Sequence, residues 1–129
     1  MSGRRLAPCP DKPNCVSTQS SDPAKRMPAL GFEGDVETVR AAILDVLARA
    51  QGARVVKAEG DYIHAEFTTL VFRFVDDVEF QIDPTAKRVD FRSASRVGHS
   101  DLGTNRRRMK KLSRRLEKRA GLVPLSTGT

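Results

Sequence analysis

The run FRFVDDVEFQIDPTAKRVDFRSAS, residues 72–95, carries the strongest structural signal in the chain. Its first half has apolar side chains on even positions, and this period of two is typical of a strand with one face in the core. The segment DPTAK, residues 83–87, predicts a turn, and residues 88–95 then form a second strand. The even positions of the first strand are Phe72, Phe74, Val78, Phe80 and Ile82. One side of the second strand is shared by Val89, Phe91, Ser93 and Ser95.

A helix and a hairpin are predicted upstream of this run. Residues 53–59 and 62–69 flank Gly60-Asp61, a two-residue connection suited to a hairpin whose first turn position has a positive φ. Before them, apolar residues recur at steps of three and four over residues 36–50. This spacing predicts an amphipathic helix, with Asp35 placed to cap its start and Gly52 to close its end.

A basic helix is predicted downstream, over residues 105–120, with a narrow apolar seam at Met109, Leu112, Leu116 and Ala120. Ser100 or Thr104 is placed to cap this helix. Asp101 near its start would complement the positive end of the helix dipole.

This order of elements predicts an α+β fold: a single domain with an antiparallel sheet of three to four strands, two helices packed on one face, and an irregular N-terminal arm. We expect the arm over residues 1–31, because this part has no apolar period and contains Pro8, Pro10, Pro13, Pro23 and Pro28. We expect the α+β domain over residues 32–121 and a flexible C-terminal tail over residues 122–129.

Composition excludes several classes of protein. The chain has 129 residues, 39% of them hydrophobic and 5% aromatic, with Gly 9 and Pro 7. These values fit one globular domain and exclude collagen, coiled-coil and disordered chains. The sequence has no apolar run long enough for a membrane span and no secretion signal. As written it predicts a cytoplasmic protein; a trimmed leader would instead indicate a periplasmic or otherwise exported one.

Positive charge is concentrated in the predicted last helix. The net charge is +7, and residues 105–120 hold nine basic residues against Glu117 alone. Such an element indicates a local anionic partner, such as nucleic acid, an acidic membrane surface or an acidic protein. The simpler interpretation is a solvated helix face. The cations expected to contact nucleic acid phosphates are Arg107, Lys110, Lys111, Arg114 and Lys118.

Asp76 breaks the apolar pattern of the first long strand, because it shares the even phase of the core residues. A buried carboxylate is costly unless it is paired or hydrogen-bonded. Either Asp76 and Asp77 form a bulge, or Asp76 meets a cation or backbone donors at the edge of the core.

Three arginines, Arg106 to Arg108, crowd the positive end of the last helix, so a negative group is expected beside them. The preferred interpretation is an internal ion-pair network with Asp76, Asp77 and Glu79. The alternative is a bound anion held by the arginines and the helix N–H groups.

Cys9 and Cys15 have five residues between them, which matches neither a redox C-x-x-C motif nor a zinc ribbon. We therefore predict no metal site and no cofactor. A small disulfide-closed loop fits better and implies an oxidising compartment, whereas a reduced pair would suit the cytosol.

The quoted segments resemble a bacterial and plastid family known as domain of unknown function 1499. Three ordered motifs carry the resemblance: residues 9–17, residues 73–80, and residues 92–106 with RSASR at their start. The resemblance implies no established activity. It does imply proteins that are commonly exported, lipid-anchored or plastid-targeted, which would suit a disulfide. This chain departs from the family in lacking such a leader and in the strongly basic character of its last helix.

The second and third of these motifs supply the candidate site, which we expect to form one polar cluster at the end of the sheet. The predicted ligand-binding residues are Arg92, Ser93, Ser95, Arg96, Asn105 and Arg106. The predicted orienting residues are Asp76, Asp77, Glu79 and Asp101.

The leading hypothesis is a non-enzymatic binding or accessory domain for a small anion or an acidic group of a partner. The alternatives are sequence-independent nucleic-acid binding by the last helix, and a hydrolase that uses the same polar cluster. No catalytic residue is predicted, and the oligomeric state is left open.

Overall fold

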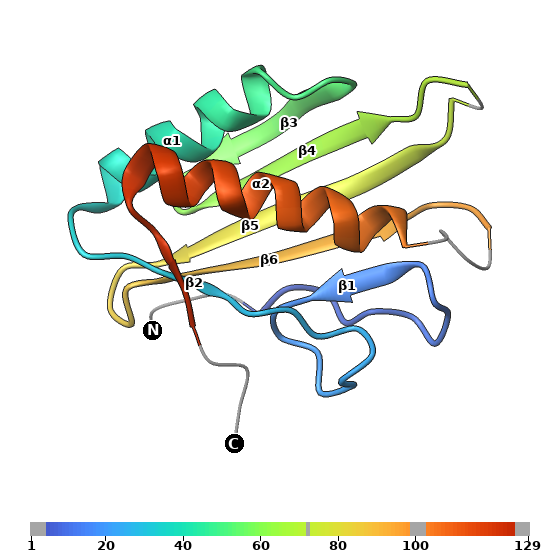
Figure 1. Ribbon diagram of the computed structural model, residues 1–129, viewed down its shortest axis with the longest axis horizontal. Helices are drawn as coiled ribbons and strands as arrows, with labels where there is room; N and C mark the ends of the chain where they lie inside the picture. Colours follow the sequence, from blue (N-terminus) through green and yellow to red (C-terminus); the bar gives the residue numbers. More distant parts are fainter. Residues whose placement is uncertain (1–4, 72, 99–102, 126–129) are drawn as a thin grey trace.

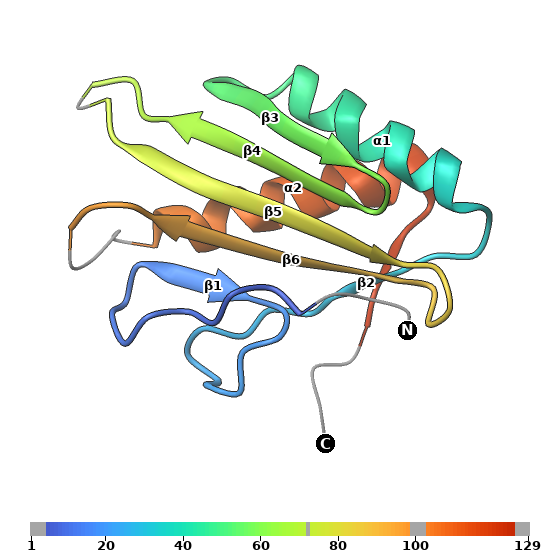
Figure 2. The same cartoon turned by 180° about the vertical axis from the view of Figure 1, so that it is seen from behind.

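The computed structural model describes residues 5–71, 73–98 and 103–125. Within these residues, one antiparallel sheet has both helices on the same face (Figures 1 and 2). The strands are β1 (Cys15–Ser17), β2 (Leu30–Gly31), β3 (Ala53–Glu59), β4 (Tyr62–Thr68), β5 (Val75–Asp83), β6 (Arg88–Ser95) and β7 (Val123–Pro124). The helices are α1 (Val36–Ala48) and α2 (Thr104–Ala120).

Strands β3 to β6 form a meander in which each strand pairs with the next one along the chain. Gly60 has a φ of 57°, so the connection between β3 and β4 has the positive φ that its sequence predicts. The register of β5 and β6 places Phe80 opposite Phe91, with ring centroids 6.2 Å apart. The alternating pattern of residues 72–95 therefore predicts the centre of the sheet correctly.

The predicted sheet of three to four strands is wrong, because the described residues alone form a sheet of seven strands. Two of the additional strands, β1 and β2, come from residues 1–31, and β7 comes from residues 122–129. β1 and β2 share the outer edge of β6, and β7 pairs with β2. Each is only two or three residues long, too short to show an alternating pattern. Each forms a strand only because the edge of a neighbouring strand completes its backbone hydrogen bonds. The α+β class itself holds.

The strand β5 begins at Val75 rather than at Phe72. A loop precedes it, closed by hydrogen bonds from Thr69 N to Phe74 O at 2.8 Å and from Phe74 N to Thr69 Oγ1 at 2.9 Å. Phe74 consequently lies in this loop, where its side chain is exposed. Phe72 lies outside the described residues.

Helix α1 begins as its sequence predicts, because the Asp35 carboxylate accepts a hydrogen bond from Thr38 N at 2.7 Å. Its last residue is Ala48, with Arg49 as the cap. Gly52, predicted to close the helix, has a φ of 80°, and a Cβ there would lie 2.6 Å from the carbonyl oxygen of Thr68. Gly52 is therefore needed for the close approach of β4.

Helix α2 has Gly103 at its N-cap position, with no side-chain hydrogen bond. Thr104 is thus the first helical residue and not the cap; Ser100 and Asp101 lie outside the described residues. The buried stripe of this helix is Asn105, Met109, Leu112 and Leu116. It covers the sheet next to α1, and the core between the layers includes Ile43, Leu47, Ile63, Phe80 and Phe91.

Cys9 and Cys15 form a disulfide. It closes a loop immediately before β1, and buried Val16, Met27 and Leu30 join the segment that follows to the core. None of the described helices combines the length and apolar character that a bilayer span requires.

Candidate functional site

The predicted polar residues lie on both faces of the sheet rather than in one group. We call Asn14, Asp76, Ser93, Ser95, Asn105 and Arg108 the inner cluster, because they meet between the sheet and α2. We call Tyr62, His64, Glu66, Asp77, Glu79, Arg92 and Arg96 the outer row, on the face away from the helices. Alternation of side chains along β5 separates Asp76 from Asp77 and Glu79.

The inner cluster is a hydrogen-bond network that joins β5 and β6 to α2. Arg108 Nη2 donates to Asp76 Oδ2 at 2.7 Å, and Arg108 Nη1 donates to Asn105 Oδ1 at 2.9 Å. Asn105 Nδ2 donates to Ser95 Oγ at 3.0 Å and to Asn14 O at 3.2 Å. The pairing of β5 with β6 continues through Asp76 without a bulge. The Asp76 carboxylate therefore meets a cation, which is one of the two alternatives that the sequence predicts. Asp76, Ser93 and Asn105 are buried, and their partners are groups of the chain itself.

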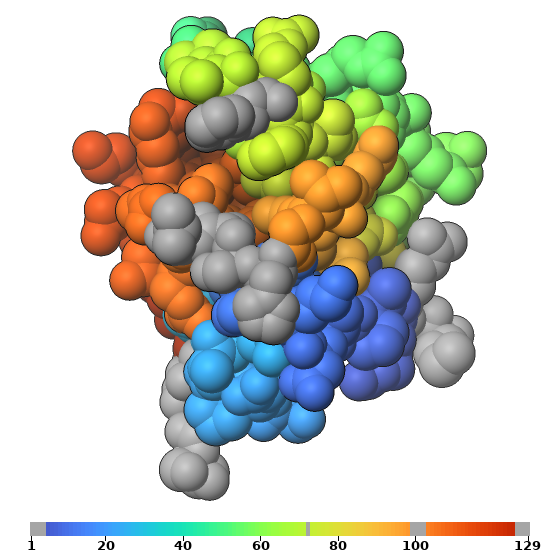
Figure 3. Space-filling view, turned by 90° about the vertical axis from the view of Figure 1, so that its right-hand side faces the viewer, coloured from blue at the N-terminus to red at the C-terminus, as the bar shows by residue number. Residues whose placement is uncertain are grey.

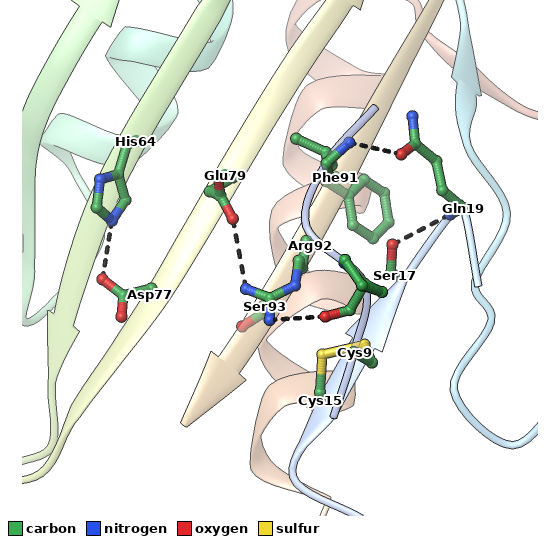
Figure 4. Close-up of polar contacts among 12 residues, drawn as sticks. Cys9, Cys15, Ser17, Gln19, His64, Asp77, Glu79, Phe91, Arg92 and Ser93 are labelled. Atoms are coloured by element: carbon green, nitrogen blue, oxygen red, sulfur yellow. Dashed lines mark hydrogen bonds and ion pairs between the residues drawn. A yellow bond between two sulfur atoms is a disulfide. The ribbon is translucent and has the colours of Figure 1, made fainter. Parts of the chain in front are cut away.

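The outer row pairs its charges internally (Figure 4). Arg96 contacts Asp77 at 2.8 Å and Glu66 at 2.7 Å, and His64 contacts Asp77 at 2.8 Å. The hydrogen bond from Arg96 holds the pKa of the Asp77 carboxyl below its ordinary value; partial burial opposes this shift, and His64 reinforces it. The same bond raises the pKa of Arg96.

Arg92 and Arg106 join segments that are distant in the sequence. Arg92 contacts Glu79 at 3.4 Å (Figure 4) and donates to the carbonyl oxygen of Pro8, which precedes Cys9, at 3.3 Å. Arg106 donates to Ala24 O at 2.7 Å, which attaches the N-terminal segment to the start of α2. Asp101 lies outside the described residues.

A cleft that the sequence analysis did not predict lies between the end of α1, the end of β4 and the first half of α2. We call it the cationic cleft; its volume is about 490 Å³, within the usual range for small-molecule sites. Its cations are Arg49, Arg107, Arg108, Lys111 and Arg115. Its apolar side chains include Phe67, Leu70 and Leu112, and its lining also includes Thr68, Thr69 and Thr104.

Within the part of the chain that the structure describes, two cations of the cationic cleft, Lys111 and Arg115, have no carboxylate partner. Arg108 is paired with Asp76, and Arg49 contacts Asp45 at 3.1 Å. Among the described residues, no carboxylate lines the cleft, and none forms an ion pair with Lys111 or Arg115. Arg107, Lys111 and Arg115 follow one another at intervals of four, so they lie on one side of α2.

The cleft has an apolar floor beneath these cations. The Arg108 guanidinium lies 4.8 Å from the centroid of the Phe67 ring, and Leu112 is buried beside it. Arg107 and Lys111 belong to the cations predicted from the sequence to bind nucleic acid. Arg49 and Arg115 do not belong to that predicted set. They lie in the same cleft because α1 packs against α2.

Lys110, Arg114 and Lys118, which complete the predicted nucleic-acid set, are exposed on α2 outside the cationic cleft. Asp76, on which a hydrolase mechanism would depend, is 1% exposed and bound to Arg108, so a substrate in solution does not reach it.

The fold and the cleft define a small α+β domain, in which the described residues form a seven-stranded antiparallel sheet with α1 and α2 on one face and a basic cleft beside α2. A family model described as "Protein of unknown function (DUF1499)" matches residues 5–116. The chain therefore belongs to this family, as its three motifs indicated. No curated protein and no solved structure gives a significant match to the chain.

Proposed function

We propose that this domain binds an anionic ligand in the cationic cleft. The observation that carries the proposal is the unneutralised charge of Lys111 and Arg115, beside Arg107, over an apolar floor. Like charges four residues apart destabilise a helix, so this arrangement has a cost in the unliganded protein that a bound anion removes.

The chemistry of the lining favours a phosphate or carboxylate group attached to an apolar part. Guanidinium groups donate paired hydrogen bonds to such oxygens, and threonine hydroxyls add single donors. Phe67, Leu70 and Leu112 offer apolar contact to the remainder of the ligand. Arg92 and Arg96 are weaker candidates than the cleft, because Glu79, Asp77 and Glu66 already pair with them.

The proposal is tested by a thermal-shift screen with phosphate, sulfate, short-chain carboxylates, nucleotides and duplex DNA, at low and moderate salt. We expect an anion to raise the melting temperature of the native chain at both salt concentrations. Lys111→Glu should abolish this rise. The matched variant Lys110→Glu has the same change of charge on the same helix, outside the cleft, and should retain it.

Two results would contradict anion binding in the cleft: no stabilisation by any anion, or equal loss in both variants. Stabilisation by duplex DNA alone, abolished by salt and by Lys110→Glu, would favour nucleic-acid binding instead. The exposed Lys110, Arg114 and Lys118 keep that second candidate open.

The disulfide supports a proposal about compartment. Disulfides persist in oxidising environments and are rare in the cytosol. We therefore propose that the protein works outside the reducing cytosol, which a thiol-labelling assay on protein from its native source would test. Unlabelled Cys9 and Cys15 before reduction are expected; full labelling would contradict the proposal.

A further inference from the structure

Exposed apolar side chains gather on the loop between β4 and β5. Leu70 is 67% exposed, Val71 is 82% exposed and Phe74 is 49% exposed. Val97, on the segment that follows β6, is a fourth exposed apolar residue at the same end of the molecule. Single exposed apolar residues are ordinary, but a contiguous group of them indicates an interaction surface. We call Leu70, Val71 and Phe74 the apolar tip.

Hydrogen bonds among Thr69, Arg73 and Phe74 close the loop that carries the apolar tip. Thr69 closes the loop at both ends through its bonds to Phe74, and Arg73 N donates to Thr69 O at 3.1 Å. Arg73 takes the left-handed conformation, with a φ of 59°, which is uncommon for a residue other than glycine. The loop projects beyond the ends of α1 and β3 (Figure 1). Leu70 and Val71 are therefore held away from the core.

Cations lie next to the apolar tip. Arg73 lies within the loop, and Leu70 itself lines the cationic cleft together with Arg107 and Lys111. Figure 3 views this end of the molecule, with the loop beside the start of α2. The apolar surface and the excess positive charge are thus continuous.

We propose that the apolar tip docks this protein on an anionic lipid bilayer, with a lipid phosphate group entering the cationic cleft. Apolar side chains inserted at the headgroup boundary, with basic residues next to them, are the combination that holds proteins on anionic membranes. A narrow projecting turn suits insertion into a fluid interface, whereas protein partners pack against broader surfaces. The phosphate part of this proposal rests on the proposed function of the cleft; the docking part rests on the tip.

The first test is co-sedimentation with vesicles of phosphatidylcholine containing about 30 mol% phosphatidylglycerol, and with phosphatidylcholine alone. We expect binding to the anionic vesicles only. Val71→Asp should lower the partition coefficient by about tenfold or more, because it removes an apolar contact and adds a repelled charge. Val123→Asp is the matched control, since Val123 is 58% exposed on β7, outside the tip. Val123→Asp should lower the binding to anionic vesicles only slightly, through the change in net charge.

A second test uses the absence of tryptophan from the sequence. Val71→Trp places a single fluorophore on the tip, and Val123→Trp places one on β7. Anionic vesicles should shift the emission of Val71→Trp to shorter wavelength and leave that of Val123→Trp unchanged. No shift for Val71→Trp, or equal shifts for both, would overturn insertion of the tip.

The two proposals fail in different ways. Val71→Asp should still be stabilised by soluble anions while losing vesicle binding, whereas Lys111→Glu should lose both. If Val71→Asp binds anionic vesicles as the native chain does, docking by the tip is wrong and anion binding in the cleft stands. If vesicle binding depends on Val71 and not on Lys111, the tip docks the protein but no lipid phosphate enters the cleft.

Discussion

The guanidinium of Arg108 on α2 and the carboxylate of Asp76 on β5 meet at 2.7 Å, with only 12% and 2% of their side chains exposed. This pair joins the second helix to the centre of the sheet. Arg108 also forms part of the floor of the cationic cleft. The position of this part of the floor is therefore fixed by a buried carboxylate.

Asp76→Asn should destabilise the domain by about 3 kcal/mol, because it leaves the Arg108 charge buried without its counter-ion. Urea unfolding measures the change. Glu59→Gln, at an exposed ion pair with Lys57, is the control and should change the free energy of unfolding by less than about 0.5 kcal/mol. Similar values for the two variants would show that the buried pair contributes no more than a surface pair.

Acid should destabilise the outer row through Asp77. The pKa of this carboxyl is held below its ordinary value of 3.8, chiefly by the hydrogen bond from Arg96. A lowered pKa in the folded state means that the stabilisation is complete above pH 3.8 and is lost as the pH falls through the folded-state value. Asp77→Asn should therefore be less stable than the native chain at neutral pH, with the difference narrowing in acid.

Urea titrations between neutral pH and acid, on both proteins, measure this narrowing. Asp22 and Asp35, whose carboxyl pKa values are also lowered by hydrogen bonds to the backbone, keep part of the acid dependence in the variant. A constant difference at all pH values would show that Asp77 acts by packing alone.

Reduction of the Cys9–Cys15 disulfide should lower the free energy of unfolding by about 2 kcal/mol, the chain-entropy value for a loop of this small size. Thermal unfolding with and without dithiothreitol measures the effect. The double variant Cys9→Ser, Cys15→Ser should resemble the reduced protein and be insensitive to dithiothreitol. A native chain equally stable in both conditions would show that the loop is held by its other contacts.

Lys111→Glu should stabilise the unliganded domain by roughly 0.5 kcal/mol at low salt, because it replaces repulsion from Arg107 and Arg115 by attraction. Lys110→Glu relieves similar repulsion from Arg106 and Arg114, so its stability should rise by a similar amount. The difference between these variants then lies in their response to anions. Chemical unfolding at two salt concentrations measures the gain, which salt should reduce. A loss of stability in Lys111→Glu would indicate that Lys111 has a structural role.

The sequence predicts those elements of the fold whose own residues show a periodic pattern or a capping residue. Val78, Phe80 and Phe91 alternate over several residues, and Asp35 supplies a cap in front of a periodic run, so the meander and α1 follow from the sequence. β1, β2 and β7 carry no comparable signal. Their hydrogen bonds depend on β6 and on each other, and such pairing between distant segments is not encoded in a two-residue run.

The sequence likewise predicts only part of the candidate site. Residues close in sequence, such as Asp76 and Asp77, were expected to act together, but the period of two places them on opposite faces of the sheet. The ligand roles predicted for Arg92, Ser93, Ser95, Arg96, Asn105 and Arg106 stay predictions. The cationic cleft needs Arg49 from α1 beside Arg115 from α2, and only tertiary packing brings these residues together.

The pairing of β1 and β2 with β6 also implies an order of folding. The meander from β3 to β6 requires only short loops to close, whereas β1 and β2 pair with β6, a strand much later in the sequence. Residues 5–31 are therefore expected to associate after the centre of the sheet has formed. While a cell makes this protein, one edge of the sheet is thus expected to stay exposed until residues 5–31 pair with β6.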